Sequence, residues 1–278
     1  MVAILAPSFG LFIVLRRLSL IADTLSHVAL MGVAIGFVTS IYPTFVALIA
    51  TTSSAAGIEQ LRSRGRLPGD AALAIFLYSS LAIAVIVISK SSGFNADLFG
   101  YLFGTVLSIN DRDLWLIGIL LVVVIVFVAS FYAELTQSAF DQDLAHVSGV
   151  RVTATNLALA ILTGATVTAS MRVVGVLMVG ALIVIPVLAA LRLATGFRTA
   201  LLLAIGFGLL SVWVGLAVAF YADLAAGGAI VLTTVVMLAL AEVAGRIRDY
   251  FSARRGASTT AWSSTTPPVH PEADAEQR

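Results

Sequence analysis

Two side chains capable of binding a metal ion, Asp23 and His27, lie four residues apart inside a long apolar stretch. In a helix this spacing places both side chains on one face, about 6 Å apart along the axis. An ionised side chain near the centre of a bilayer costs about 2.5–3.5 kcal/mol to insert, so such residues usually serve a function. A carboxylate and an imidazole suit Zn(II), Mn(II) or Fe(II). The pair therefore predicts part of a metal site, completed by other helices, by water or by a second subunit. Met31 continues the stripe and is more simply explained by packing.

Asp23 alone has a simpler explanation, because it follows Arg17 by six residues and lies near the expected start of a helix. There a carboxylate caps the first turn and is favoured by the helix dipole. The pair with His27 is harder to explain in this way. Gly32 and Gly36 follow at a spacing of four residues, which lets a neighbouring membrane helix approach closely. This spacing predicts that the Asp23/His27 helix lies in a tight bundle and not against lipid.

The composition requires a membrane protein. Of the 278 residues, 60% are hydrophobic and 11% are charged, and the mean hydropathy is +1.05, whereas soluble domains are about 25% charged. The apolar runs are continuous and do not alternate with polar residues, so the spans are helices and not barrel strands. The chain has no cysteine, which excludes disulfides and thiolate metal sites.

Nine apolar segments predict an all-α polytopic bundle of eight to nine spans. Residues 1–250 are expected to form the transmembrane domain, and residues 251–278, rich in Ser, Thr and Pro, a disordered cytoplasmic tail in which His270 is incidental. The first segment would be only about 22 Å long, short of a bilayer core of about 30 Å, so we expect the natural start to lie upstream of Met1. The segments are Met1–Leu15, Leu20–Ser40, Thr44–Ile58, Ala71–Ser89, Leu114–Tyr132, Thr153–Ser170, Val173–Leu191, Thr199–Tyr221 and Ala229–Gly245.

Basic residues predict the orientation, because cytoplasmic loops carry an excess of Lys and Arg. With nine spans, only Lys90, Arg112 and Arg172 fall on one side. The N-terminus is then outside and the C-terminus is cytoplasmic, in the bacterial plasma (inner) membrane. The other side carries Arg16, Arg17, Arg62, Arg64, Arg66, Arg151, Arg192, Arg198, Arg246, Arg248, Arg254, Arg255 and Arg278.

Another apolar segment contains residues that weaken a helix. Pro186 removes a backbone donor and leaves the Leu182 carbonyl without its helical partner, and Gly175 and Gly180 lie in the same segment. One explanation is a kinked packing helix, which membrane proteins tolerate. The other is a flexible or broken helix that lines a translocation path.

The longest inner loop, Ala139–Val152, has the composition of a short helix at the membrane surface. Asp141 and Asp143 lie near its start, where the helix dipole favours them, and Gly149 can end it in a left-handed conformation. We expect Ala139, Phe140, Leu144, Ala145 and Val147 to pack on one side, and His146 to be a surface residue. An ordinary connector needs none of these features, whereas a loop that docks into another protein does.

The chain resembles the integral-membrane permeases of bacterial ABC importers for zinc, manganese and iron. Five stretches carry the resemblance, in the family's order: "RRLSLIADTLSHVALMGVAIG", "ADLFGYLFGTVLSINDRDLW", "DQDLAHVSGV", "MRVVGVLMVGALIVIPVLAALRLA" and "FYADLAAGGAIVL". The resemblance implies a homodimer that binds a cytoplasmic ABC ATPase and receives metal from an extracytoplasmic binding protein. It assigns Asp23 and His27 to the metal path. The family's coupling-loop pattern falls on Asp143, Ala145 and Gly149, and its helix bearing Gly and Pro favours a mechanistic role for Gly175, Gly180 and Pro186.

The resulting hypothesis is alternating access driven by ATP hydrolysis in a partner, with the metal as cargo, no permanently bound cofactor and no nucleic acid. Zinc is favoured, because "ADTLSH" resembles zinc permeases more closely. The alternative is a secondary transporter or channel that uses Asp23 and His27 as an ion relay. A third class, an intramembrane enzyme, is disfavoured because the sequence has neither an H-E-x-x-H nor a G-x-S-x-G motif and offers no second intramembrane acid to pair with Asp23. Outer acidic residues are expected either to attract a metal-loaded partner or merely to aid solubility: Asp97, Asp111, Asp113 and Asp223.

Overall fold

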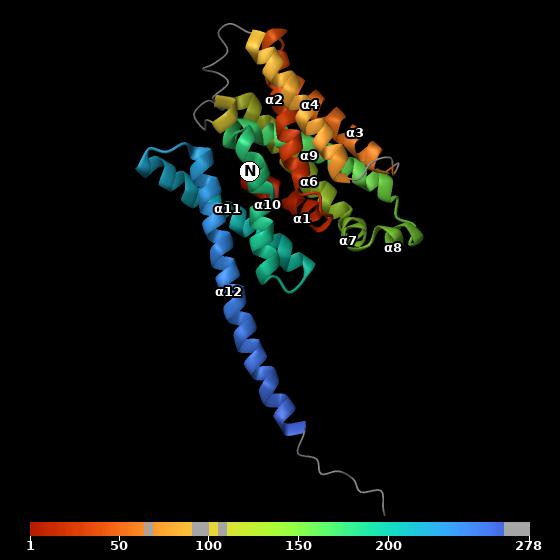
Figure 1. Ribbon diagram of the computed structural model, residues 1–278, viewed down its shortest axis with the longest axis vertical. Coiled ribbons are helices and arrows are strands. Elements are labelled where there is room, and N and C mark those ends of the chain that lie inside the picture. Colours follow the sequence, from red (N-terminus) through yellow and green to blue (C-terminus); the bar gives the residue numbers. More distant parts are fainter. Residues whose placement is uncertain (64, 66–68, 91–99, 105–109, 264–278) are drawn as a thin grey trace, which may run out of the picture.

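The computed structural model describes residues 1–63, 65, 69–90, 100–104 and 110–263. Within these ranges every regular element is a helix, which confirms the predicted all-α class (Figure 1). One further helical turn covers residues 100–103. The helices are α1 (Val2–Leu15), α2 (Leu20–Val38), α3 (Pro43–Ser63), α4 (Gly69–Lys90), α6 (Asp111–Ser130), α7 (Tyr132–Phe140), α8 (Gln142–Val147), α9 (Val152–Val174), α10 (Val176–Leu193), α11 (Phe197–Ala222) and α12 (Ala226–Ser263).

Six of the described helices are long and apolar enough to cross a bilayer: α2, α4, α6, α9, α11 and α12. The predicted count of eight to nine spans is therefore not supported, although each of the nine apolar segments contains a helix. The helices α1 and α10 are apolar but shorter. In α3, the polar run 51–54 and Glu59 interrupt the apolar sequence.

The helix α2 lies inside the bundle, where it packs against α3, α4, α9 and α10. Its glycines permit this packing. A Cβ at Gly32 would lie 2.5 Å from the Cα of Ala47, and one at Gly36 would lie 2.7 Å from the Cα of Pro43. Real Cβ atoms do not approach backbone this closely, so the predicted close approach of a neighbouring helix to α2 is confirmed, and that helix is α3.

A single residue, Gly175, separates α9 from α10, and its φ of 94° ends α9. Two other glycines meet this junction. A Cβ at Gly104 would lie 2.6 Å from the nitrogen of Gly175, and one at Gly227 would overlap the carbonyl oxygen of Val174. Since only glycine lacks the Cβ, the backbones of three segments can be in contact here: the junction, the turn at 100–104 and the start of α12.

The short helices α7 and α8 lie at the other end of α9, because α8 immediately precedes the start of that helix (Figure 1). With 23 residues, α9 is about 34 Å long and separates this α8 end from the glycine junction. We refer to these two ends of the bundle as the α8 end and the glycine end.

The helix α12 is the longest described, with 38 residues, or about 57 Å. Its C-terminal half projects away from the bundle (Figure 1). Residues 251–263 continue this helix beyond the predicted domain end at residue 250. The remainder of the predicted tail, including His270, lies outside the described residues.

Candidate metal-binding site

Asp23 and His27 lie on one stripe of α2 that continues through Met31 and Ile35, and all four residues are half-buried. Most other positions along this helix, such as Leu25 at 0% exposure, are buried in the bundle. The stripe is thus the part of an interior helix that stays accessible to a metal ion or to a second protein chain.

The imidazole of His27 has a nitrogen that needs a partner. Its Nδ1 is buried and, among the described residues, has no hydrogen-bond partner. A buried polar atom without a partner costs free energy. Coordination of a metal ion would satisfy this nitrogen, and the carboxylate of Asp23 one turn away would contribute an oxygen ligand to the same ion.

The helix α10 approaches this stripe through Gly180. The atoms nearest to a Cβ built at Gly180 are the N, Cα and Cβ of Asp23, at 3.5–3.7 Å. Of the three residues predicted to line the path, Gly180 therefore lies beside Asp23. Gly175 forms the junction with α9, and Pro186 lies within α10, which stays helical on both sides of it.

Asp23 is not the N-cap residue of α2, although its place in the first turn still suits the helix dipole. Ser19 occupies the N-cap position of α2, and Asp23 lies inside the first turn. Over the ranges that the structure describes, no group of three or more His, Asp or Glu side chains could hold a metal ion. Asp23 and His27 are therefore two candidate ligands, and a metal site built on them would need further ligands.

The predicted surface helix corresponds to α8, and its ends form as expected. The carboxylate of Asp141 accepts hydrogen bonds from the backbone N–H groups of Asp143 and Leu144, at 2.9 and 3.1 Å. Gly149 has a φ of 86° and follows the helix in the left-handed region. Ala145 is buried against the bundle, so this residue fixes the side of α8 that faces inward.

The packing predicted for the other apolar residues of this loop is wrong. Phe140, Leu144 and Val147 are 73%, 65% and 86% exposed, because a helix of six residues can bury only one narrow side. His146 is exposed, as predicted. Exposed apolar patches often mark interaction sites, so α8 is a candidate docking surface.

The sequence interpretation misplaced Asp113, which was grouped with exposed acids. Its side chain is buried and forms an ion pair with Arg172 of α9. The hydroxyl of Tyr42 donates a hydrogen bond of 3.2 Å to Asp113 and accepts one of 3.3 Å from Arg172. This cluster joins α6, α9 and the residue before α3 at the glycine end. Asp111 and Asp223 are exposed, and Asp97 lies outside the described residues.

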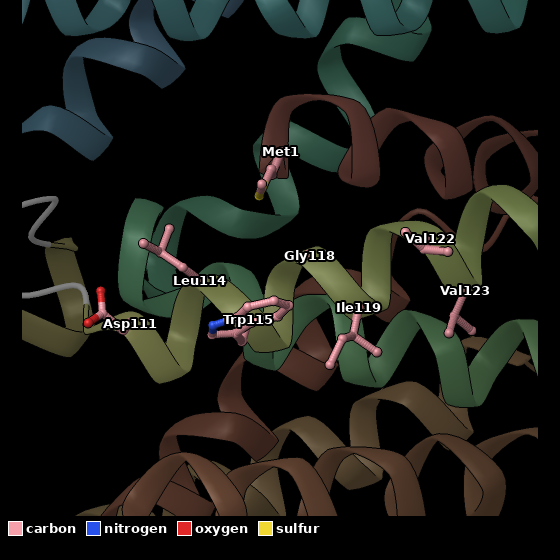
Figure 2. Close-up of a pocket in the computed structure, with 8 residues that line it drawn as sticks. All are labelled: Met1, Asp111, Leu114, Trp115, Gly118, Ile119, Val122 and Val123. Carbon is pink, nitrogen blue, oxygen red and sulfur yellow. The ribbon is translucent and has the colours of Figure 1, made fainter.

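An apolar groove of about 640 Å³ lies along α6 (Figure 2). It extends from Asp111 along Trp115 and Ile119 to Val123, with Met1 at one side. Neither Asp23 nor His27 lines it, and its one ionisable side chain is exposed. Its lining is almost entirely apolar, so it adds nothing to a metal site.

Several known proteins resemble this chain in sequence or in structure. A family model described as the ABC 3 transport family matches residues 1–244. A protein of Treponema pallidum named "Probable metal transport system membrane protein" is 35% identical over 240 residues, 86% of this chain and 90% of that protein.

Two further relatives carry the names of specific metals. The "High-affinity zinc uptake system membrane protein ZnuB" of Haemophilus influenzae is 32% identical over 86% of this chain and 91% of its own length. The "Manganese transport system membrane protein MntC" of Listeria monocytogenes is 31% identical over 86% of this chain and 85% of its own. Among solved structures, "PsaBC from Streptococcus pneumoniae in complex with Fab" superposes with a TM-score of 0.76 at 28% identity, and the match covers 86% of each chain.

Proposed function

Because the chain belongs to the ABC 3 transport family, we propose that it is the membrane permease of an ATP-driven importer for a divalent transition metal. It forms the translocation path, and a separate ABC ATPase subunit hydrolyses ATP. The observation that supports this function most strongly is the accessible stripe of Asp23 and His27 on an otherwise buried helix, with an unpaired imidazole nitrogen. Its relatives are named as zinc and manganese transport proteins.

Two copies of the chain complete the site in this proposal. Each protomer contributes one carboxylate and one imidazole, so a homodimer supplies four ligands, which satisfies a tetrahedral ion. The half-buried stripe supports this arrangement, because a second copy would cover it. Asp23 and His27 suit zinc, manganese and iron. We favour zinc, on the resemblance of the "ADTLSH" stretch.

In the membrane, the α8 end of the bundle faces the cytoplasm and the glycine end faces outward. The arginines support this orientation, since Arg16 follows α1, Arg62 lies in the last turn of α3 and Arg151 precedes α9, all at the α8 end. The N-terminus then lies outside and the C-terminus inside the plasma membrane. A metal-binding protein docks at the glycine end, and the ATPase docks at α8.

Transport requires that the site open to one side at a time. The exposed apolar surface of α8 receives the ATPase. The helix α10 can respond because it begins at the Gly175 junction and contains Pro186, both of which weaken helical hydrogen bonding. Its Gly180 lies against Asp23, so a shift of α10 changes the surroundings of the carboxylate. The ion leaves when the ligands separate.

The test uses proteoliposomes that contain the permease together with its ATPase and binding protein. We expect uptake of radioactive zinc or manganese that requires ATP and is abolished by Asp23→Asn. The alternative, a secondary transporter or channel, predicts uptake by the permease alone along an ion gradient. Uptake that proceeds at the full rate without the ATPase would overturn the proposal.

A further inference from the structure

Arg16 lies at the α8 end of the bundle, in the corner between α1 and α2. It directly follows α1 and precedes Asp23 by seven residues. Its guanidinium donates a hydrogen bond from Nη2 to Oγ of Ser138 in α7, 122 positions away in the sequence. The neighbouring Arg17 is exposed, so the two adjacent arginines have different environments.

The guanidinium of Arg16 is a half-buried cation whose hydrogen-bond partner is a neutral hydroxyl. Among the described residues it has no carboxylate within 4 Å, and its Nε is buried without a hydrogen-bond partner. The nearby carboxylate of Glu59 is occupied by Arg62, at 3.0 Å from both Nε and Nη2. Burial is the main cause that lowers the pKa of Arg16 to about 10, with a further contribution from Arg62. The group stays protonated at neutral pH, and a buried charge is normally paired.

The hydrogen-bond partner of Arg16, Ser138, lies on α7, the helix that directly precedes α8. Ser138 is 1% exposed and follows Leu135, which is fully buried, so α7 is firmly seated at this point. The helix α7 packs against both α1 and α8, whereas α8 packs against α7 and α9. A displacement of α8 therefore reaches α1 through α7, and it reaches α9 directly.

Aromatic contacts reinforce this connection. The ring of Phe197, at the start of α11, lies 5.5 Å from that of Tyr132 and 6.3 Å from that of Phe140, both in α7. It also lies 5.3 Å from the ring of Phe12 in α1. Stacked and edge-on rings at these distances attract each other. α7 is thus held to the C-terminal end of α1 by one polar bond and one aromatic cluster.

We propose that Arg16 is a positioning residue for transport, which passes movement of α8 through Ser138 to the corner that sets the position of α2. This inference rests on the proposed function, since it assumes that the ATPase acts on α8. The corner of residues 16–19 is the only covalent connection between α1 and α2. A shift of the guanidinium is therefore carried into the first turn of α2, where Asp23 lies. The aromatic cluster keeps α7 and α1 in contact, whereas the hydrogen bond fixes their register.

The proposal predicts a specific defect in coupling. In proteoliposomes with the ATPase and binding protein, Arg16→Gln and Ser138→Ala lower the amount of zinc or manganese transported per ATP by about five-fold, within the range by which single residues change coupling between sites. ATP hydrolysis and the amount of ATPase bound to the permease stay within about two-fold of the wild type. Arg17→Gln is the matched control, because it makes the same chemical change one residue away on an exposed side chain, and it keeps the wild-type ratio.

Two comparisons separate positioning from a structural role. Because both groups form one link, the double variant Arg16→Gln/Ser138→Ala is no worse than Arg16→Gln alone. Ser138→Ala removes only a hydroxyl, so it tests the link even where Arg16→Gln lowers the yield of folded protein. A wild-type ratio in Ser138→Ala, or a parallel loss of hydrolysis and uptake in both variants, would overturn the inference. Failure of the wild-type protein to show ATP-driven uptake would instead refute the proposed function.

Discussion

The buried ion pair between Asp113 and Arg172 provides a test of how the glycine end of the bundle is held together. Both side chains are largely shielded from solvent, at 6% and 15% exposure. Arg172 also donates to Tyr42 and lies over the ring of Tyr101, 5.5 Å from its centroid. Asp113→Asn would remove the negative charge and leave the guanidinium buried without its counter-charge.

The expected cost follows from this burial. Removing one partner of a buried ion pair costs about 3–5 kcal/mol. For a chain of this size each kcal/mol corresponds to about 2–4 °C in Tm, so the loss amounts to about 6–20 °C. Replacing Arg172 by Met as well removes the stranded cation. The double variant should therefore recover part of the loss, with an interaction energy of about 0.5–3 kcal/mol.

The assay is thermal unfolding of the purified protein in detergent, followed by its intrinsic fluorescence. Asp111→Asn is the matched control, because it makes the same change two positions away on an exposed side chain, and its effect should stay within about 0.5 kcal/mol. A Tm of Asp113→Asn equal to that of the control, or a double variant less stable than Asp113→Asn, would refute the role assigned to the pair.

Three further outcomes are expected. Gly32→Ala should lower the free energy of unfolding by about 1–3 kcal/mol, because the new Cβ would overlap α3. Gly118→Ala, whose Cβ would meet nothing within 4 Å, should raise it by about 0.5–1 kcal/mol. Equal Tm values for the two variants would contradict the packing of α2. Leu144→Glu or Val147→Glu should lower the amount of co-purified ATPase at least about ten-fold without changing Tm, since both side chains are exposed; undiminished co-purification would show that α8 is not the docking surface. Gly227→Ala should reduce the yield of monodisperse protein in size-exclusion chromatography, because a Cβ would overlap the carbonyl that precedes the α9–α10 junction, and a wild-type elution profile would contradict that close approach.

Local features were predictable from the sequence because their causes are local. Continuous apolar runs located all nine segments that contain helices, and the four-residue spacing of Asp23 and His27 placed both on one face of α2. Asp141 caps the start of α8 with its carboxylate, and Gly149 follows the end of this helix in the left-handed region, as predicted. The predicted count of spans is too high because it includes α1 and α10, which are shorter, and α3, whose apolar sequence is interrupted by polar residues.

Contacts between residues far apart in the sequence could not be predicted from sequence patterns. Arg16 and Ser138 are 122 positions apart, and Arg172 and Asp113 are 59 apart. Neither sequence separation indicates that the two residues are in contact. Asp113 is predicted to be exposed because it lies two residues after Asp111, which is exposed. Only the packing of α6 against α9 buries its carboxylate beside a cation.

The central claim is that Asp23 and His27 bind the transported ion between two copies of the chain. The most direct test is the binding of zinc and manganese to the purified permease, measured by calorimetry together with metal analysis. We predict one ion per two chains, with binding lost in Asp23→Asn and in His27→Ala while both variants stay folded. Unchanged binding in both variants would contradict the claim.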